Sequence, residues 1–414
     1  LFADSDKKSV HFLDLSISSN WLGTSSDFQD VNYFQFKIDQ LQKEHFDSII
    51  AGGYLEHRPL YTSSAYDKIG NHGIESRCVH LGVDFWLPSQ TAVFALWDGE
   101  IETVVEDRGD KTYGGLMIIK HKTDAFEFYS LYGHLSLDSI KKHKKGTRIP
   151  KGSKIAELGA PNENGNWAPH LHFQLMLTLM NFKDDFPGVA YSNQKSVWKS
   201  ICPDPNLFFK EVNLDHQKKD SNHEIFTDRK LYLGKGMSLQ YQNPLHIVRG
   251  EGVYLIDHQG RKYIDTVNNV AHVGHEHPRV VKKGQEQMAV LNTNSRYLHK
   301  NITKLAKTLL QTLPKNLEVI HFVNSGSEAN ELALRMVKTA TDSNQMIVSE
   351  VGYHGNTNGC VEISSYKFDG KGGKGAPKNT HIIPIPDSFR GRFRGEETGS
   401  LYAEEVKKCI ERKI

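Results

Sequence analysis

The 414-residue sequence is poor in cysteine and carries no excess of charge of either sign. Its formal net charge of +2 gives no strong field that would attract nucleic acid or an anionic membrane surface. The few cysteines lack Cys-x-x-Cys spacing, which excludes a dense disulfide framework and favours a reducing compartment. They are Cys78, Cys202, Cys360 and Cys409. We therefore expect a cytoplasmic protein with neither nucleic acid nor a membrane as a partner.

Long apolar runs and targeting signals are also missing. No run is long enough to cross a bilayer, and residues 1–6 contain neither the basic region nor the apolar region of a secretion signal. The sequence starts on Leu1 without an initiator methionine and stops inside an amphipathic pattern formed by Leu401, Val406 and Ile410. These features predict a fragment that is cut at both ends.

The sequence contains enough chain for roughly two or three domains. Its hydrophobic content of 38% and charged content of 24% are those of a globular protein. Residues 1–70 are predicted to form an N-terminal linker module, with a strand at 10–16 and a helix at about 36–50. Within this module, His57 and Arg58 are interpreted as a surface pair.

The remaining chain is predicted to form two domains joined by a linker. Residues 71–190 show short β runs, among them 91–95, 99–105 and 116–119, separated by glycine and asparagine turns, which predicts an all-β domain. The polar stretch 191–240 is the predicted linker. Residues 241–414 alternate strand-like and helical segments, which predicts an α/β domain.

Histidines supply the most complete chemistry in the β region. In Pro169-His170-Leu171-His172-Phe173, alternation along a strand turns both imidazoles toward the same face. His80 and Asp84 stand four positions apart upstream, and His134 adds a further imidazole. Such nitrogen and oxygen ligands hold a catalytic zinc, with three from the protein and one position left for water. The two remaining histidines are then available for proton transfer.

These motifs resemble those of the lysostaphin-type zinc metallopeptidases, a family of peptidoglycan endopeptidases. The matches follow the family's order: His80-x-Gly82-x-Asp84, Ala95-x-x-Asp98-Gly99, Tyr132-Gly133-His134-Leu135 and Pro169-His170-Leu171-His172-Phe173. The resemblance implies that His80, Asp84 and His172 bind zinc. It implies further that His134 and His170 polarise the metal-bound water and stabilise the tetrahedral intermediate. Whether the domain cuts a peptide stays open, because fold and metal do not fix the substrate.

A second constellation lies in the α/β region. The apolar pair Phe322-Val323 is followed by a Ser325-Gly326-Ser327 turn and then by a predicted helix. A helix start presents free backbone N–H groups and the positive end of the helix dipole, which suits a phosphate group. Further along, Tyr353-His354-Gly355 exposes an aromatic ring that could stack on a flat cofactor.

These segments resemble the N-terminal part of class-III pyridoxal-phosphate aminotransferases. The shared motifs are Gly250-x-Gly252-x-Tyr254, Gly274-His275-x-His277-Pro278, Asn324-Ser325-Gly326-Ser327-Glu328-Ala329 and Tyr353-His354-Gly355. The resemblance implies that Gly326 and Ser327 hold the cofactor phosphate, that Tyr353 stacks on the pyridine ring and that His354 shapes the same wall. The predicted fold class is multidomain: an all-β zinc-peptidase-like domain, then an incomplete α/β domain of pyridoxal-phosphate-dependent transferase fold type I.

One branch of the class-III family resembles this sequence further, at residues 268–275, 291–299 and 366–370. That branch is the ethanolamine-phosphate and phosphohydroxylysine phospho-lyases, which eliminate phosphate from a phosphorylated amino alcohol. Lys367 and the Gly/Lys-rich loop 370–375 are candidate cationic partners for that phosphate, although such a loop can equally be a solvated segment. The Schiff-base lysine and the acidic partner of the pyridine nitrogen are expected beyond this chain. Lys235 is rejected because it precedes all of these motifs.

The sequence therefore predicts a fragment of a bifunctional bacterial enzyme that uses zinc and pyridoxal 5'-phosphate. Its expected substrate is an amine or a phosphorylated amino alcohol, with a peptide as a possible second substrate, and the full-length protein is expected to form a homodimer. By resemblance, a small-molecule kinase of the aminoglycoside phosphotransferase type would precede it. Two alternatives stay open: a cell-wall metalloendopeptidase with a passenger domain, and a non-catalytic zinc-binding scaffold.

Overall fold

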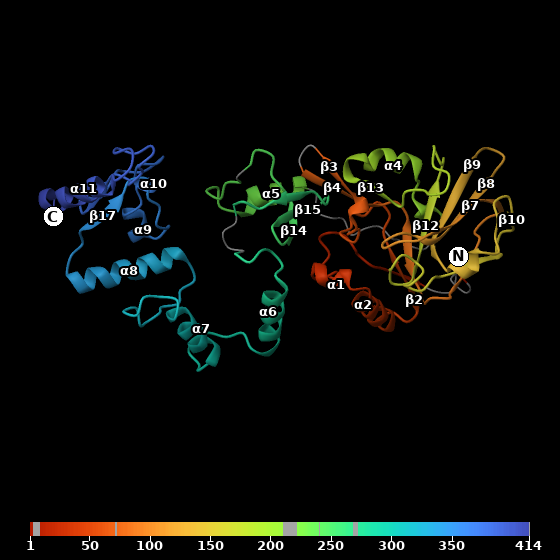
Figure 1. The fold of residues 1–414 in the computed structure, drawn as a ribbon, viewed down its shortest axis with the longest axis horizontal. Coiled ribbons are helices and arrows are strands. Elements are labelled where there is room, and N and C mark those ends of the chain that lie inside the picture. Colours follow the sequence, from red (N-terminus) through yellow and green to blue (C-terminus); the bar gives the residue numbers. More distant parts are fainter. Residues whose placement is uncertain (3–8, 71–72, 210–221, 240, 268–271, 414) are drawn as a thin grey trace. The chain divides into compact units, whose positions relative to one another are not determined.

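The computed structural model describes residues 1–414 apart from 3–8, 71–72, 210–221, 240, 268–271 and 414 (Figure 1). Parts of the predicted linker and of the 268–275 motif therefore lie outside the described residues. The chain divides into two compact units, Leu1–Asn292 and Thr293–Ile414. Among the described residues, no helix combines the length and the apolar character that crossing a membrane requires.

The first unit is built on an eight-stranded sheet with the strand order β1-β2-β5-β12-β9-β8-β7-β10. Neighbouring strands are antiparallel except for the parallel pair β1 and β2. The predicted β runs at 99–105 and 116–119 form β7 and β8, which lie beside β9 in Figure 1. In chain order the strands of this sheet are β1 (Ser9–Phe12), β2 (Ser48–Gly52), β5 (Val83–Trp86), β7 (Gly99–Asp107), β8 (Gly114–Lys122), β9 (Glu127–Leu135), β10 (Arg148–Ile149) and β12 (His170–Met176).

Smaller sheets and short helices complete this unit. Two further sheets pair β6 (Ala92–Phe94) with β11 (Lys154–Glu157), and place β4 (Gly73–His80) between β3 (Asp67–Gly70) and β13 (Val189–Tyr191). A three-stranded sheet contains β14 (Ile247–Glu251), β15 (Tyr254–Asp257) and β16 (Lys262–Ile264). The helices are α1 (Ser25–Gln29), α2 (Val31–Glu44), α3 (Leu137–Ile140), α4 (Lys195–Ile201), α5 (Asn222–Tyr232) and α6 (Pro278–Val290).

Strand alternation divides the core of the large sheet between its two faces. On β12, Leu171, Phe173 and Leu175 join the apolar cluster on one face, which also contains Met117 and Ile119 of β8. Because side chains alternate along a strand, the polar residues between them point to the other face. The apolar side chains thus fix the face on which the histidines of β12 stand.

The N-terminal residues are part of this sheet. Strand β2 pairs with β5, and all five of its residues are buried. The predicted helix at 36–50 is wrong in its second half, because α2 ends at Glu44 and residues 48–52 form β2. The sequence Ser-Ile-Ile-Ala-Gly is a short continuous apolar run, which suits a strand buried on both faces better than an amphipathic helix.

The second unit contains five helices and one strand pair among its described residues. Strands β17 (Met346–Ser349) and β18 (Thr380–Ile383) are parallel. The helix predicted after Ser325 is confirmed as α8 (Gly326–Thr341), and its N-cap Ser325 accepts a hydrogen bond from the backbone N–H of Glu328. The other helices are α7 (Lys300–Leu310), α9 (Asn358–Glu362), α10 (Ser365–Phe368) and α11 (Gly399–Lys413).

Candidate functional site

The large sheet brings the five polar residues of the β region into one buried place. His80 is the last residue of β4, Asp84 lies on β5, and His134 lies near the end of β9. On β12, His172 stands directly opposite Asp84, and His170 is two residues away on the same face. All five side chains are buried, so water screens their interactions weakly.

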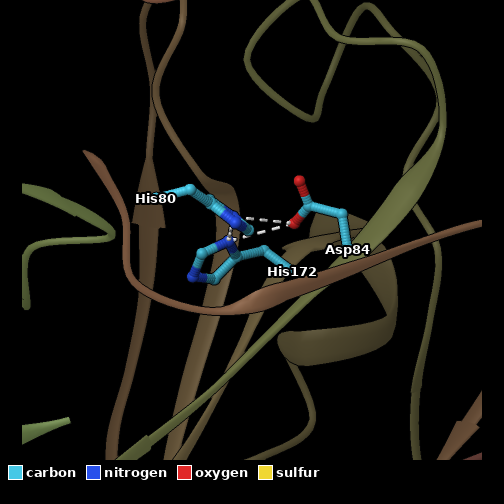
Figure 2. Close-up of side chains that lie close together, drawn as sticks. All are labelled: His80, Asp84 and His172. Atoms are coloured by element: carbon cyan, nitrogen blue, oxygen red, sulfur yellow. Dashed lines mark hydrogen bonds and ion pairs between the residues drawn. The ribbon is translucent and has the colours of Figure 1, made fainter. Parts of the chain in front are cut away.

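Three of these side chains form a tight cluster (Figure 2). His80 Nε2 lies 2.9 Å from His172 Nδ1 and 3.2 Å from Asp84 Oδ1. His172 Nδ1 lies 3.1 Å from the same Asp84 oxygen. A tetrahedral zinc with bonds of about 2.0–2.1 Å separates its ligand atoms by roughly 3.3 Å, so the triangle has the size of such a ligand set.

Hydrogen bonds fix the tautomer of each imidazole in the cluster. His80 Nδ1 lies 2.9 Å from the carbonyl oxygen of Gly53, which can only accept, so Nδ1 carries the proton. Gln174 Nε2 donates to the carbonyl oxygen of Pro187, which turns Gln174 Oε1 toward His172 Nε2 at 3.0 Å. His172 is therefore protonated on Nε2. Both histidines present an unprotonated nitrogen to Asp84 Oδ1.

Three lone pairs thus converge with no proton of their own between them. Such an arrangement is repulsive by itself and becomes favourable around a cation, because each donor then shares its lone pair with the ion. In metal sites, the ring nitrogen of a histidine that does not bind the metal is typically held by a hydrogen-bond partner. Here the carbonyl oxygen of Gly53 holds His80 Nδ1, and Gln174 Oε1 holds His172 Nε2. The donor set of two imidazoles and one carboxylate therefore fits a zinc ion.

The charges around the cluster keep its groups in the protonation states that a metal requires. Burial, together with the positive charge of Arg58, lowers the pKa of His80 to about 4. Burial alone would raise the pKa of Asp84, but His80 and Arg58 outweigh it and hold that pKa well below its usual value. Neutral histidine and ionised aspartate are the forms that bind metal.

The two remaining histidines stand beside the cluster with one free nitrogen each. His134 donates from Nδ1 to the carbonyl oxygen of Asn164 at 2.9 Å, and His170 donates from Nδ1 to that of Ala168 at 2.7 Å. Their ring centroids are 4.2 Å apart, and His170 Nε2 lies 3.9 Å from Asp84 Oδ1. Burial lowers the pKa of both rings, so both are neutral at pH 7 and each offers Nε2 as a base.

His134 also adopts a backbone conformation that is rare for histidine. Its φ of +62° lies in the left-handed region, where a residue with a side chain is strained. The adjacent Gly133 faces His172 across the β9–β12 pair, and a Cβ there would come within 2.5 Å of the Tyr113 ring. The glycine thus lets β9 approach closely enough for His134 to reach the site.

The interpretation of Arg58 as a surface residue is wrong. Its side chain is buried and forms ion pairs with Glu56 and with Asp84 Oδ2. His57, by contrast, is only half-buried and contacts Ser192. The spacing of Glu56 and Arg58 could have indicated this ion pair, because residues two positions apart in an extended segment point to the same side.

A cavity of about 240 Å³ opens beside the cluster. Its lining includes the cluster itself, both free imidazoles and the aromatic side chains of Tyr61, Tyr66 and Trp167. Lys111 is buried against the Trp167 ring, with its Nζ 4.0 Å from the ring centroid. An aromatic wall next to polar groups is typical of a site that binds an organic ligand.

We expect the metal-free first unit to lose stability as the pH falls from 6.5 toward 4. His80, His134 and His170 have a lower pKa in the folded than in the unfolded chain. Below 6.5 the unfolded chain therefore binds protons that the folded chain excludes, and stability declines until the folded pKa is reached. At about 1.4 kcal/mol per pH unit, His80 accounts for about 3 kcal/mol. Burial raises the pKa of Glu56 to about 7, which contributes a similar amount of the opposite sign, so His134 and His170 set the net loss.

Urea unfolding at pH 7.5, 6.0 and 5.0 measures this effect. All five tryptophans lie between residues 21 and 198, so their fluorescence reports on the first unit. Equal unfolding midpoints at pH 7.5 and pH 5.0 would contradict the buried, neutral state of these histidines.

Gly82→Ala is expected to displace His172. A Cβ at position 82 would lie 2.6 Å from the backbone oxygen of Phe173 and 2.8 Å from His172 Nε2. Overpacking of this kind costs about 1–3 kcal/mol, and the displaced ring should bind metal more weakly. Zinc titration and urea unfolding measure both effects. The matched control is Gly284→Ala in α6, where a Cβ meets open space. Unchanged zinc affinity in Gly82→Ala would contradict the close contact between position 82 and the His172 ring.

The second unit brings the start of α8 against the loop that follows β17. Gly355 has a φ of +135°, and a Cβ there would lie 2.6 Å from Ser327 Oγ. Ser327 Oγ accepts a hydrogen bond from the backbone N–H of Asn356 at 3.1 Å. In a second hydrogen bond, Asn330 Nδ2 of α8 donates to the carbonyl oxygen of His354 at 2.7 Å.

The start of α8 also presents backbone amides to a ligand. Gly326 and Ser327 are the first helical residues, so the helix itself provides no acceptors for their N–H groups. A Cβ at Gly326 would meet open space.

Tyr353 leads into the same loop with an exposed ring. Its side chain is 52% exposed and meets Tyr366 edge to face, with 6.0 Å between the ring centroids. The ammonium group of Lys367 lies 5.5 Å from the centroid of the Tyr353 ring. Lys371 and Lys374 of the Gly/Lys-rich loop are exposed. The structure thus places Lys367 beside the Tyr353 ring.

Two segments of the chain match models of known families. Residues 78–183 match the model of peptidase family M23, and residues 237–414 match that of aminotransferase class III. These matches confirm the predicted resemblances and the predicted fold class. Arg58 and β2 lie before the first of these matches.

Similar proteins include the "alanine–glyoxylate aminotransferase 2-like" protein of Drosophila melanogaster, 40% identical over 210 residues, or 49% of this chain and 42% of that protein. "Ethanolamine-phosphate phospho-lyase homolog 1" of Caenorhabditis elegans is 36% identical, covering 46% and 43%. A solved phospholyase from Arthrobacter in complex with phosphoethanolamine is 34% identical, with a TM-score of 0.41, covering 46% of this chain and 44% of that one.

The chain spans less than half the length of these curated relatives. The matched stretches lie end to end along the sequence without overlap. The chain is therefore similar to peptidase family M23 over residues 78–183 and to aminotransferase class III over residues 237–414.

Proposed function

We propose that the part of the first unit before residue 237 is a zinc-dependent peptide hydrolase and that residues 237–414 are part of a pyridoxal-phosphate-dependent enzyme, so that the whole protein is bifunctional. The observation that carries the first half is the convergence of three lone pairs, from His80 Nε2, His172 Nδ1 and Asp84 Oδ1, in a buried pocket. Zinc, when bound, would polarise the scissile carbonyl and activate water at neutral pH.

The chain's own residues supply the proton transfers. His134 and His170 are neutral and hold their Nδ1 protons in hydrogen bonds to backbone carbonyls. Each can therefore accept a proton only at Nε2, from the attacking water, and can return it to the leaving amine. Positioned acid–base groups of this kind contribute about 10²–10⁴-fold to a rate. The cavity with its aromatic wall would hold the peptide and reduce its contact with water.

Hydrolysis of glycine-rich and D-alanyl peptides by the zinc-loaded protein tests this half. Turnover that is lost in His134→Ala, with zinc retained, supports hydrolysis. Zinc binding without turnover of any of these peptides would overturn the hydrolase proposal and favour a scaffold. A secretion signal in the intact protein would favour the cell-wall endopeptidase with a passenger domain.

For the second half, we propose an aminotransferase or phospho-lyase that acts on an amine or a phosphorylated amino alcohol, in a cytoplasmic homodimer. The class-III match and the curated relatives support this proposal. Pyridoxal phosphate, when bound, supplies the electron sink for reactions at the substrate's amine-bearing carbon. Gly326 and Ser327 would hold its phosphate at the start of α8, Tyr353 would stack on its ring, and His354 would shape the same wall.

Gly355→Ala is expected to weaken pyridoxal-phosphate binding by about 5- to 150-fold. Its Cβ would meet Ser327 Oγ at 2.6 Å and push the loop away from the helix start, at a cost of about 1–3 kcal/mol. Equilibrium dialysis against the cofactor measures the loss. Gly399→Ala, where a Cβ meets open space, is the control. Equal affinity in both variants would contradict a phosphate site at this contact.

The products of the whole protein separate the two chemistries. A phospho-lyase should release inorganic phosphate from ethanolamine phosphate without an added keto acid. The curated relatives include both an aminotransferase-like protein and a phospho-lyase homologue, so this measurement decides between the two reactions. Phosphate release that depends on a keto acid would overturn the lyase assignment, and amino-group transfer without phosphate release would identify a transaminase.

A further inference from the structure

A buried arginine contacts the candidate metal ligand Asp84 from outside the M23 match. Arg58 is 2% exposed, and its Nη1 donates to Asp84 Oδ2. Its Nε donates to Glu56 Oε2 at 2.7 Å. The guanidinium therefore joins two buried carboxylates, and only one of them belongs to the metal cluster.

This contact divides the two oxygens of Asp84 between two partners. Oδ2 is engaged by Arg58, whereas Oδ1 faces His80 Nε2 and His172 Nδ1 at 3.2 and 3.1 Å. Only Oδ1 is then available to an ion. A carboxylate without a partner on Oδ2 could rotate and offer both oxygens.

The backbone holds Arg58 in a fixed place. Its N–H donates to the carbonyl oxygen of Cys78 at 2.8 Å, and the N–H of His80 donates to the carbonyl oxygen of Glu56 at 2.9 Å. The segment 56–58 thus runs alongside the end of β4, next to the candidate ligand itself. At Gly52, a Cβ would come within 2.9 Å of Arg58 Nη2, so the absence of a side chain makes room for the guanidinium.

We propose that Arg58 is a positioning residue of the metal centre, which restricts Asp84 to one ligand oxygen, and that Glu56 holds Arg58 for this task. The inference rests on the proposed zinc site. It assigns to the segment before residue 78 a part in metal binding that the matched family region does not contain.

Charge and positioning predict opposite effects on metal affinity. The positive charge of Arg58 repels a cation, so a purely electrostatic role predicts tighter zinc binding once the charge is removed. A positioning role predicts weaker binding, because the loss of an outer partner of a ligand typically costs 10- to 100-fold in metal affinity. Burial raises the pKa of Glu56 to about 7, so at pH 8 or above removing Glu56 and Arg58 together leaves the net charge unchanged and isolates the positioning effect.

The test compares zinc affinity, measured by competition with a chelator, in the wild-type protein and in Glu56→Gln/Arg58→Met. We expect the double variant to bind zinc about 10- to 100-fold more weakly. The visible spectrum of the cobalt-substituted variant should weaken, because Asp84 then offers a second oxygen and raises the coordination number. Arg108→Met is the matched control, since Arg108 is an exposed arginine of the same unit that pairs with Glu106. Its affinity and spectrum should equal those of the wild type.

Arg58→Lys carries the same test if the double variant fails to fold. It keeps the charge, but one ammonium group cannot reproduce the fork that joins both carboxylates, so weaker binding is again expected. Wild-type zinc affinity and an unchanged cobalt spectrum in a folded variant would overturn the inference while leaving the zinc site intact. Tighter binding would overturn it in favour of a charge effect, and failure of both variants to fold would assign Arg58 to folding alone. A wild-type protein that binds no zinc would overturn the proposed site itself.

Discussion

His172→Ala is expected to abolish stoichiometric zinc binding by the first unit. The substitution removes Nδ1 from a cluster in which three atoms converge, and His80 and Asp84 remain as a pair. The affinity should fall by more than the 10- to 100-fold that the loss of an outer partner costs, because a direct ligand is lost. Isothermal titration of the metal-free protein with zinc measures the change.

His321→Ala is the control for this experiment, because His321 is exposed and lies in the other unit. It should bind zinc as the wild type does. If His172→Ala also kept wild-type affinity, the ion would bind elsewhere. Peptide hydrolysis, if present, should disappear together with the metal, whereas His134→Ala should lose hydrolysis and keep the metal.

Removing residues 1–70 is expected to unfold the M23 region. This segment supplies β2, which pairs with β5 beside the metal cluster, and it supplies Arg58. Without Arg58, Asp84 would be a buried carboxylate without its cation, which costs about 3–5 kcal/mol. Without β2, Phe85 and Trp86 lose apolar cover worth about 1.5–3 kcal/mol each. The total is comparable to the 5–15 kcal/mol that stabilises a whole domain.

Tryptophan fluorescence and limited proteolysis compare a chain of residues 71–209 with one of residues 1–209. The longer chain keeps β1, β2 and Arg58 and should unfold cooperatively. The shorter chain should be digested rapidly and show the fluorescence of exposed tryptophan. Cooperative unfolding of the shorter chain at the same midpoint would contradict a structural role for the N-terminal strands and would support the predicted boundary at residue 70.

The cluster could be predicted only in part from local spacing, because the choice of His80, Asp84 and His172 as ligands came from the resemblance of four ordered motifs to a metallopeptidase family. His80 and Asp84 lie on different strands, and the tertiary fold brings them together. His170 and His172 share a strand face, so alternation along the strand predicts how this pair points. The start of α8 was predictable for a similar reason, since Ser325 and Glu328 form a cap within four residues.

Arg58 and β2 could not be predicted because their environment comes from distant parts of the chain. Arg58 pairs with a carboxylate 26 positions away, and its burial depends on strands that its own sequence does not indicate. The run Ser48–Gly52 is apolar throughout, so periodicity could not separate a buried strand from the continuation of α2. Tertiary pairing with β5 decided the outcome.

X-ray absorption at the zinc edge of the metal-loaded protein tests the central claim most directly. We expect one zinc per chain, a first shell of nitrogen and oxygen only at about 2.0–2.1 Å, and the outer scattering of two imidazole rings. A shell that contains sulfur, or a spectrum without imidazole scattering, would contradict it.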